Sequence, residues 1–404
     1  MPTTDIVKLT QKGLGADADG RLFLRALPGE TVEFDQDDGP LVAPRVVTPS
    51  TDRVAAVCRH FKTCGGCLMQ HASEQSVADW KTEIVRLGLA SQGIETNILP
   101  ILTSPPQTRR RAKFAARRTK KGAMIGFHMR GSDGLVAVPD CQLVTPSLRS
   151  MIQMLEEFTV EFGSRKGELA LTVTDSLGGL DVMVENGKEL VDAMRVTLAA
   201  AAGRYDFARL TWNDETIVTR RAPAHQFGKA QVAPPPGAFL QAAKEGELAL
   251  TSAVQNALGD ASIVVDLFAG AGTFTIPMAE TAQVHAVEGV ADMLETLDAG
   301  WRMATGLKRV TTEARDLFRR PLLPDEFHKK DGVVIDPPRA GAEAQTHEIA
   351  NSAVPLVASV SCNPVTFARD ARILVDAGFA LDWVQPVDQF RWSNHTEIAA
   401  RFSR

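Results

Sequence analysis

The sequence predicts an α/β protein in which a small N-terminal β-barrel and a central α+β region precede a Rossmann-like, doubly wound parallel sheet. Short β-branched runs alternate with helical segments from residue 262 to the C-terminus, which is the pattern of a parallel sheet with helices on both faces. In residues 1–50, brief apolar runs are separated by Asp-Gly at 19–20 and Pro-Gly at 28–29. Such turn pairs between alternating apolar residues indicate a small barrel of the OB type.

Proline-rich segments mark the domain boundaries. "QVAPPPGAF", residues 231–239, contains three consecutive prolines, which exclude both a helix and a central strand. "VVTPSTD", residues 46–52, has the composition of a linker. We therefore expect three domains, at residues 1–50, 51–235 and 236–404, of which the second mixes helices and strands.

The composition is that of an ordinary globular protein, with 404 residues of which 44% are hydrophobic and 23% charged. The start, "MPTTDIVKLTQKGLG", lacks a charged segment followed by an apolar core, so no signal peptide is expected. No apolar stretch is long enough to span a bilayer. Five cysteines, an odd number, argue against a disulfide framework and favour a reducing compartment. We therefore expect a cytoplasmic monomer without membrane contact.

The formal net charge of −5 conceals one strongly basic stretch at residues 108–130. This stretch contains no Asp or Glu, and Phe114 and Phe127 are interspersed among its charges. A solvated surface is the simpler interpretation. The combination nevertheless favours contact with nucleic-acid phosphates, with aromatic rings available for stacking. Its basic residues are Arg109, Arg110, Arg111, Lys113, Arg117, Arg118, Lys120, Lys121 and Arg130.

The doubly wound region begins with a glycine turn typical of nucleotide sites. Gly270 and Gly272 lie between the strand "SIVVDLF" and a helix, where glycines let the backbone approach a ligand at the helix N-terminus. A packing turn is the alternative. Glu288 ends the next strand and is placed to bind ribose hydroxyls. Asp316 follows a further strand, where a carboxylate can accept from an adenine amine.

The same turn lacks the features of phosphate-binding sites. A dinucleotide site needs a third glycine, but Thr273 and Phe274 follow Gly272, and no Walker lysine is present. This disfavours NAD and ATP and leaves an adenosyl ligand without phosphates, of which S-adenosylmethionine fits best. "IDPPR", residues 335–339, places Asp336 at another strand end in the same crevice, although a buried turn would give the same pattern.

Cys362, in "VSCNPVTFARD", falls at the end of the next strand and directly before a helix. An inert buried cysteine is the commonest alternative, but a helix N-terminus can lower the pKa of a thiol. A thiolate beside a methyl donor can add to C6 of uracil and so make C5 nucleophilic, after which a base must remove the C5 proton. Glu397, in "HTEIAARF", is the candidate base because burial in an apolar strand would raise its pKa. An exposed strand glutamate is the alternative.

The other four cysteines have the spacing of metal ligands. "CRHFKTCGGC" places Cys58, Cys64 and Cys67 in a C-x5-C-x2-C arrangement, and Cys141 completes a set of four. Four thiolates suit zinc and an iron–sulfur cluster equally well. His60 and His71 flank the group as alternative ligands.

These motifs together resemble the bacterial RNA uracil-5-methyltransferase family, and in particular its iron–sulfur members with an N-terminal TRAM domain. "CRHFKTCGGCLMQH", "GAFLQAAKEGE", "DLFAGAGTFTIP", "IDPPRAG", "SCNPVTFARD" and "HTEIAARF" follow in family order over nearly the whole chain. The resemblance implies an RNA-binding TRAM barrel, Cys362 as nucleophile and Glu397 as base. It also implies a [4Fe-4S] cluster on Cys58, Cys64, Cys67 and Cys141, with S-adenosylmethionine contacts from Gln241, Phe268, Thr273, Glu288, Asp316 and Asp336. The sequence departs from the family at Ala243, where an Asn is usual, and in "FRWSNHTE" before Glu397.

The leading hypothesis is therefore S-adenosylmethionine-dependent formation of 5-methyluridine in structured RNA, with 23S rRNA as the expected substrate. The same chemistry on a tRNA T-loop uridine is the first alternative. A non-catalytic iron–sulfur RNA-binding protein that senses redox state is the second, and the presence of Cys362, Asp336 and Glu397 argues against it.

Overall fold

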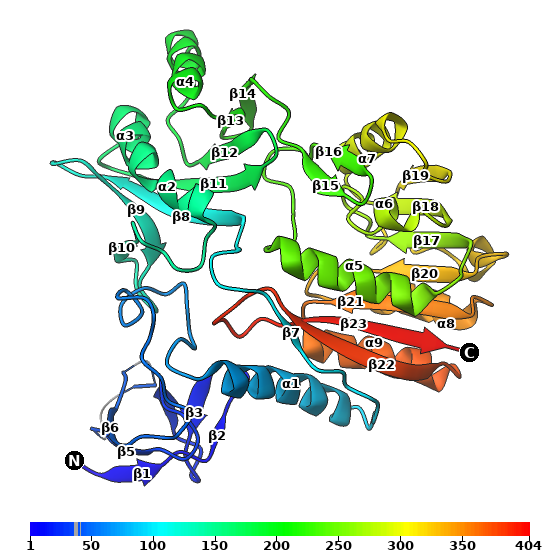
Figure 1. The fold of residues 1–404 in the computed structure, drawn as a ribbon, viewed down its shortest axis with the longest axis horizontal. Helices are drawn as coiled ribbons and strands as arrows, with labels where there is room; N and C mark the ends of the chain where they lie inside the picture. The colour runs from blue at the N-terminus through cyan, green and yellow to red at the C-terminus, as the bar shows by residue number, and fades with distance from the viewer. Residues whose placement is uncertain (36–38, 41) are drawn as a thin grey trace.

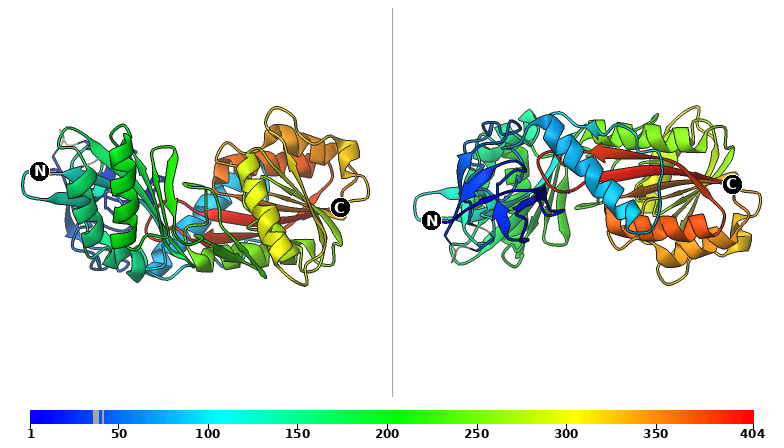
Figure 2. Two further views of the ribbon diagram at one scale, coloured as in Figure 1. Left: turned by 90° about the horizontal axis from the view of Figure 1, so that it is seen from above. Right: turned by 90° about the horizontal axis from the view of Figure 1, so that it is seen from below.

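The computed structural model describes residues 1–35, 39–40 and 42–404. Figure 1 shows three groups of elements: the N-terminal strands at lower left, a sheet with helices α3 (Ile152–Phe162) and α4 (Asp192–Arg204) at upper left, and a larger sheet on the right. The views from above and below in Figure 2 show an elongated molecule with its two termini at opposite ends. In the described part of the chain, none of the helices combines the length and the apolar character needed to cross a lipid bilayer.

The first six strands form two small sheets, in the orders β1-β5-β6 and β2-β3-β4. Ile6, Phe23, Ala26 and Val32 are buried together and form their core. Within the described residues these strands are hydrogen-bonded as two sheets and not as one closed barrel, so the predicted OB-type barrel is not confirmed. The strands are β1 (Thr3–Asp5), β2 (Lys8–Leu9), β3 (Leu14–Ala16), β4 (Leu22–Leu24), β5 (Thr31–Glu33) and β6 (Arg45–Thr48).

The second sheet has seven strands in the order β10-β9-β8-β11-β12-β13-β14. Alternate residues of its strands, such as Phe114, Leu171 and Val182, pack with Leu155 and Phe158 of α3 in one buried core, as expected for a sheet covered on one face. Its strands and first helix are β8 (Arg111–Arg118), β9 (Ala123–His128), β10 (Leu135–Ala137), α2 (Pro146–Ser150), β11 (Glu168–Ser176), β12 (Gly179–Glu185), β13 (Arg209–Trp212) and β14 (Glu215–Thr219).

The third sheet has eight strands in the order β19-β18-β17-β20-β21-β23-β22-β7. Its strands are β7 (Leu102–Thr103), β17 (Ile263–Leu267), β18 (Gln283–Glu288), β19 (Val310–Ala314), β20 (Gly332–Ile335), β21 (Leu356–Ser361), β22 (Ala380–Asp388) and β23 (Glu397–Ser403). The helices that accompany it are α1 (Glu74–Ala90), α5 (Lys244–Leu258), α6 (Thr275–Met278), α7 (Ala291–Met303), η1 (Pro324–Phe327), α8 (Glu343–Asn351) and α9 (Pro364–Asp376). The short hairpin β15 (His225–Phe227) and β16 (Ala230–Val232) precedes α5.

Each face of the eight-stranded sheet has its own core. Val265 of β17 packs with residues of α1, α8 and α9, whereas its neighbour Val264 packs with residues of α5, α6 and α7. This alternation follows from the two-residue period of a strand. A sheet buried on both faces needs near-continuous apolar strands, which explains the runs "SIVVDLF" and "VPLVASV".

The predicted parallel order holds for β17 to β21, but the sheet ends differently. β23 pairs antiparallel with both β21 and β22, so β22 and β23 form a hairpin rather than a further crossover unit. Only a loop and not a helix separates the two strands, and antiparallel strands can be joined without a crossover. The hairpin brings the last strand back beside β21, the strand that directly precedes Cys362.

Candidate active site

Three of the predicted residues lie at adjacent carboxyl ends of parallel strands. Leu267 of β17 is in register with Val287 of β18 and with Ile335 of β20. The next residue on each strand is therefore Phe268, Glu288 and Asp336, respectively. Carboxyl ends of parallel strands beside a change in strand order form the ligand crevice of such folds.

The hairpin adds the two candidate catalytic residues to the same edge. Ser361 of β21 is paired antiparallel with Ile398 of β23, so Cys362 and Glu397 occupy the next opposed positions. Glu397 and Asp336 both raise the pKa of Cys362, and Glu397 raises that of Asp336. Such mutual effects require short separations, so the three groups lie in one site. The structure thus brings together the predicted nucleophile, the predicted base and the strand-end carboxylate.

The glycine turn after β17 is shaped for close approach. Phe268 has a φ of 62°, which is uncommon for a residue with a side chain, and Gly270 and Gly272 have φ values of 56° and 95°. A Cβ on Gly272 would lie 2.9 Å from a side-chain carbon of Leu297, so this glycine is required for packing as well as for conformation. The Gly270 N–H donates to Oε2 of Glu288 at 3.0 Å, which fixes the turn against β18.

Glu288 and Asp316 are both engaged with the backbone. The second oxygen of Glu288 accepts from the Val290 N–H at 2.9 Å. Asp316 is exposed and accepts from the Phe318 N–H at 3.0 Å. The ring of Phe318 lies 5.4 Å from that of Phe268, so two aromatic rings stand beside the two carboxylates. Flat apolar rings next to hydrogen-bond acceptors suit a nucleoside.

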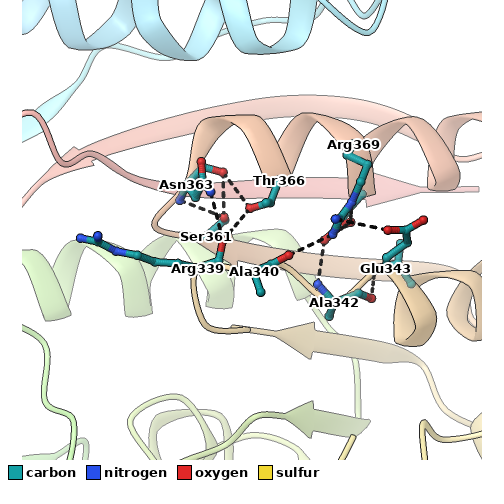
Figure 3. A network of polar contacts seen from close by, with 10 residues as sticks. Arg339, Ala340, Ala342, Glu343, Ser361, Asn363, Thr366 and Arg369 are labelled. Atoms are coloured by element: carbon teal, nitrogen blue, oxygen red, sulfur yellow. Dashed lines mark hydrogen bonds and ion pairs between the residues drawn. The ribbon is translucent and has the colours of Figure 1, made fainter. Parts of the chain in front are cut away.

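A polar network fixes the segment around Cys362 (Figure 3). The Asn363 side chain caps α9 by accepting from the Val365 N–H at 3.1 Å, and its amide donates to the Arg339 carbonyl at 3.0 Å. Ser361 Oγ accepts from the Asn363 N–H at 3.2 Å. The Ser-Cys-Asn-Pro sequence is therefore explained by a capped helix with Pro at its first position. This arrangement holds Cys362 and the Arg339 loop together.

The expectation of a lowered thiol pKa at Cys362 is wrong for the ligand-free protein. Burial raises the pKa of Cys362 to about 11, and the nearby Glu397 and Asp336 carboxyls add to the increase. Arg339 is the residue that lowers the thiol pKa, and its guanidinium also lies 3.1 Å from the ring nitrogens of His395.

Glu397 has the environment expected of a base. Its side chain is buried, and burial raises its pKa to about 7. Gln389 hydrogen-bonds to Glu397 and also donates to the side-chain oxygen of Gln241. Gln389 further accepts from the Ala242 N–H at 2.8 Å. One buried amide thus connects the predicted donor-binding residue Gln241 with the predicted base.

The loop between β22 and β23 is held by a buried lysine from a distant helix. The ammonium of Lys81 in α1 lies 2.6 Å from a carboxylate oxygen of Asp388, and neither side chain is more than 1% exposed. Lys81 also donates to the carbonyl oxygens of His395 at 2.9 Å and Phe390 at 3.3 Å. This ion pair therefore anchors the segment that carries Gln389 and Glu397.

The four remaining cysteines, which are distant in sequence from Cys362, line one cavity. Cys58, Cys64, Cys67 and Cys141 share it with apolar residues, and burial raises the pKa of Cys67 to about 12. In the ranges that the structure describes, all cysteines are free, and no three His, Cys, Asp or Glu side chains converge closely enough to hold a single metal ion. Of the two predicted alternative ligands, His60 contacts Asp140 at 2.8 Å. The His71 ring stacks on Phe61, and in the described part of the chain both of its nitrogens are buried without a hydrogen-bond partner.

Three of the nine basic residues at positions 108–130 form ion pairs within the described part of the protein. Arg110 pairs with the buried Glu247, Lys113 with Glu185 and Arg117 with Glu168. Arg111 and Arg118 donate to backbone carbonyls. Phe114 is fully buried, so it cannot stack on a base. Most of these charges therefore stabilise the contacts of the seven-stranded sheet.

The fold and this crevice define an S-adenosylmethionine-dependent methyltransferase. Residues 235–404 match the family model described as tRNA (uracil-5-)-methyltransferase. The chain is 46% identical over 403 residues to an uncharacterized RNA methyltransferase of Caulobacter vibrioides, with 97% of both chains covered. It is 33% identical to the 23S rRNA (uracil(1939)-C(5))-methyltransferase RlmD of Halomonas elongata, over 96% of this chain and 86% of that one. The protein belongs to the RNA uracil-5-methyltransferase family and is an RNA uracil-C5 methyltransferase.

Solved structures agree on the fold. The crystal structure of Pyrococcus abyssi tRNA (uracil-54, C5)-methyltransferase in complex with S-adenosyl-L-homocysteine superimposes with a TM-score of 0.77 over 99% of both chains, at 21% identity. The likeness confirms the methyltransferase fold predicted from the strand and helix pattern. The family assignment also favours the enzyme over a non-catalytic sensor.

Sequence reasoning missed Phe318, Gln389, Lys81 and Arg339. Arg339 directly follows the Asp336 motif, so its position was available in "IDPPR". Phe318 lies two residues beyond Asp316 and could have been found as an aromatic residue near a predicted ligand carboxylate. Lys81 and Gln389 carry no sequence pattern, since their roles depend on contacts with segments 309 and 147 residues away, respectively.

Proposed function

We propose that this enzyme forms 5-methyluridine in 23S rRNA, with Cys362 as the nucleophile and Glu397 as the base. The observation that carries the proposal is the placement of these two residues at opposed strand ends, beside Asp336 and the glycine turn. S-adenosylmethionine supplies an electrophilic methyl group on a sulfonium. The residues of the protein have to make a pyrimidine carbon nucleophilic and then restore the aromatic pyrimidine ring.

The thiolate of Cys362 adds to C6 of the uracil and forms a carbon–sulfur bond, and the electron pair of the C5–C6 double bond passes to C5 and O4. Once C5 carries the methyl group, the Glu397 carboxylate takes the C5 proton. The electron pair of that C–H bond reforms the C5–C6 double bond, and the C6–sulfur bond breaks to release Cys362 as thiolate. A carboxyl with a pKa of about 7 suits this step, because it is ionised near neutral pH and yet more basic than a solvated one.

The raised thiol pKa gives Arg339 a role in the first step. A thiol whose pKa is about 11 is protonated at neutral pH, so addition requires a local cation. Arg339 supplies this charge from the loop that Asn363 anchors. Ionisation of Cys362 is then coupled to the geometry of this loop, which protects the thiol until RNA is bound.

The methyl donor is proposed to bind against the residues of the glycine turn and its neighbours. Phe268 and Phe318 form an apolar wall for the adenine, and Glu288 and Asp316 offer acceptor oxygens for the ribose and the base. The other proposed donor contacts are Gln241, Gly270, Gly272, Thr273 and Asp336.

An iron–sulfur cluster is proposed on Cys58, Cys64, Cys67 and Cys141. Support comes from the shared cavity of the four thiols. A zinc ion needs all four sulfurs about 2.3 Å from one point, whereas a [4Fe-4S] core spreads its ligands more widely. Zinc is the alternative, and the resemblance of the cysteine motif to the iron–sulfur members of the family favours the cluster. Its proposed role is to hold the cysteine loop against β9 and β10.

Support for 23S rRNA comes from the near full-length similarity to the RlmD relative. A tRNA T-loop uridine remains the second candidate, since the matching family model and the superimposed structure are both named for tRNA enzymes. Mapping 5-methyluridine in total RNA of a deletion strain decides between them. Loss from 23S rRNA alone supports the proposal, and loss from tRNA alone contradicts it.

The covalent route is tested with RNA that carries 5-fluorouridine at the target position. Fluorine cannot leave as a proton, so the wild-type enzyme with S-adenosylmethionine should form a stable protein–RNA adduct that migrates slowly in a denaturing gel. The Cys362→Ala variant should form none. Methylation of ordinary RNA without any adduct on the fluorinated RNA would refute the nucleophilic role of Cys362.

A further inference from the structure

A second pocket shares Phe61, Cys64 and Cys67 with the four-thiol cavity. It has a volume of about 220 Å³ and is formed by three separate segments. Arg25 comes from the loop after β4, Lys62 and Thr63 from the cysteine loop, and Arg130 from the turn between β9 and β10. Lys62, Thr63 and the neighbouring Ser132 are exposed at its rim, so the pocket is accessible.

In the described part of the chain the cations that line this pocket have no carboxylate partner, and Cys64 and Cys67, the proposed cluster ligands, line it as well. Among the described residues that line it there are three cations and no carboxylate. In the described part of the chain, Lys62 has no ion pair and the guanidinium of Arg25 has none either, and Nε of Arg25 is buried without a hydrogen-bond acceptor. The side chain of Arg130 donates to the Cys67 carbonyl at 2.8 Å. Burial and the neighbouring Arg130 both lower the pKa of Arg25, so the two guanidiniums repel each other across the pocket.

The protein maintains Arg25 in this position at a conformational cost. Arg25 has a φ of 58°, an unusual value for a long side chain, and such outliers persist where the surroundings enforce them. Arg53 enforces it here: its guanidinium donates to the Arg25 carbonyl at 2.7 Å and to the fully buried Glu30 at 2.7 Å. The Arg25 guanidinium also lies 5.8 Å from the centre of the Phe61 ring. A charge held so firmly near another cation implies a missing anion.

We propose that this pocket binds one backbone phosphate of the substrate RNA. Arg25 and Arg130 supply planar donor groups that match phosphate oxygens, and Lys62, Thr63 and Ser132 supply further donors at the rim. The part of the basic stretch before Arg130 is the less suitable surface, because Arg110, Lys113 and Arg117 are paired with carboxylates. This inference rests on the proposed function, since it presumes an RNA substrate.

A bound phosphate would join the N-terminal strands, the cysteine loop and the β9–β10 turn. Because Cys64 and Cys67 line both this pocket and the four-thiol cavity, RNA affinity would also depend on the structure of the cysteine loop. The contact carries no base information, so it orients RNA without selecting its sequence.

The test is the salt dependence of RNA binding, measured by fluorescence anisotropy with a labelled 23S rRNA hairpin and with an unrelated hairpin of equal length. For Arg25→Gln and for Lys62→Gln, affinity should fall for both RNAs, and the slope of log K against log salt should decrease by about 0.7–0.9. Arg45→Gln is the matched control, because Arg45 is an exposed arginine of the N-terminal strands that pairs with Glu33 outside the pocket. Its slope should equal that of the wild type.

An unchanged slope in both pocket variants would overturn the proposal, and so would a loss confined to one of the two RNAs. Unchanged slopes with a decreased iron content would mean that the cations only balance the cysteine thiolates. Failure of the proposed function would give a different result: the wild-type enzyme itself would bind neither RNA, or would form no adduct with fluorinated rRNA.

Discussion

The buried Lys81–Asp388 pair offers the sharpest test of how the catalytic loop is held. Replacing Lys81 by Met keeps the aliphatic stem but removes the cation that lies 2.6 Å from the Asp388 carboxylate, whose side chain is 1% exposed. Removing one partner of a buried ion pair costs about 3–5 kcal/mol, because the remaining charge is uncompensated. The carbonyls of His395 and Phe390 also lose their donor.

We therefore expect Lys81→Met to lower the free energy of unfolding by about 3–5 kcal/mol in urea denaturation. The variant should also form the 5-fluorouridine adduct more slowly at temperatures where it is folded, because the segment that carries Gln389 and Glu397 is less fixed. The double variant Lys81→Met/Asp388→Asn should recover much of the lost stability, since it no longer buries a lone charge.

A control on the same helix separates this effect from a general loss of charge. Arg86→Met removes an exposed cation paired with Glu83, and its free energy of unfolding should stay close to that of the wild type. The reasoning is refuted if Lys81→Met is as stable as Arg86→Met. It is also refuted if the losses of Lys81→Met and Asp388→Asn simply add in the double variant.

Three further outcomes are expected. Glu397→Gln should accumulate an adduct with ordinary RNA without releasing product. Because the pKa of Glu397 is about 7, product release by the wild-type enzyme in a rapid-quench assay should increase as pH rises through about 7 and level off above it. Phe318→Ala should weaken S-adenosylhomocysteine binding by calorimetry up to about tenfold, through loss of the ring beside Phe268; unchanged affinity would remove Phe318 from the donor site. Burial raises the pKa of Asp266 from 3.8 to about 7, although hydrogen bonds from the side chain and the backbone of Thr275 oppose the increase. The folded state therefore holds the proton more tightly, and stability should fall as pH rises between these values. Asp266→Asn should flatten this dependence in thermal unfolding, and an unaltered profile would contradict the assignment.

Local sequence patterns were sufficient to predict the parallel part of the eight-stranded sheet. The strand at Ile263–Leu267 and the glycine turn after it follow from β-branched residues and from glycine spacing, which are properties of a short segment. Glu288 at a strand end, and Cys362 before a capped helix, follow for the same reason. Once the parallel topology is assumed, the carboxyl ends meet at one edge, and the site is largely determined.

Long-range contacts explain what the sequence did not reveal. Lys81 has the sequence context of an exposed helical lysine, yet a loop some 310 residues later surrounds it. The raised pKa of Cys362 depends on Glu397, which reaches the site only because the final hairpin returns antiparallel. Likewise, three charges of the basic stretch are paired by Glu168, Glu185 and Glu247 from other elements, and composition alone does not reveal such partners.

The edge strand β7 has a consequence for how the protein folds during synthesis. Its residues Leu102 and Thr103 pair with Val387 and Asp388, so this early part of the chain finds its partners only when the last strands leave the ribosome. Pairings of such high sequence separation form slowly and leave apolar surface open in the meantime. Nascent chains of this enzyme should therefore depend on chaperones until the final hairpin is made, and a premature stop shortly before β23 would abolish solubility along with activity.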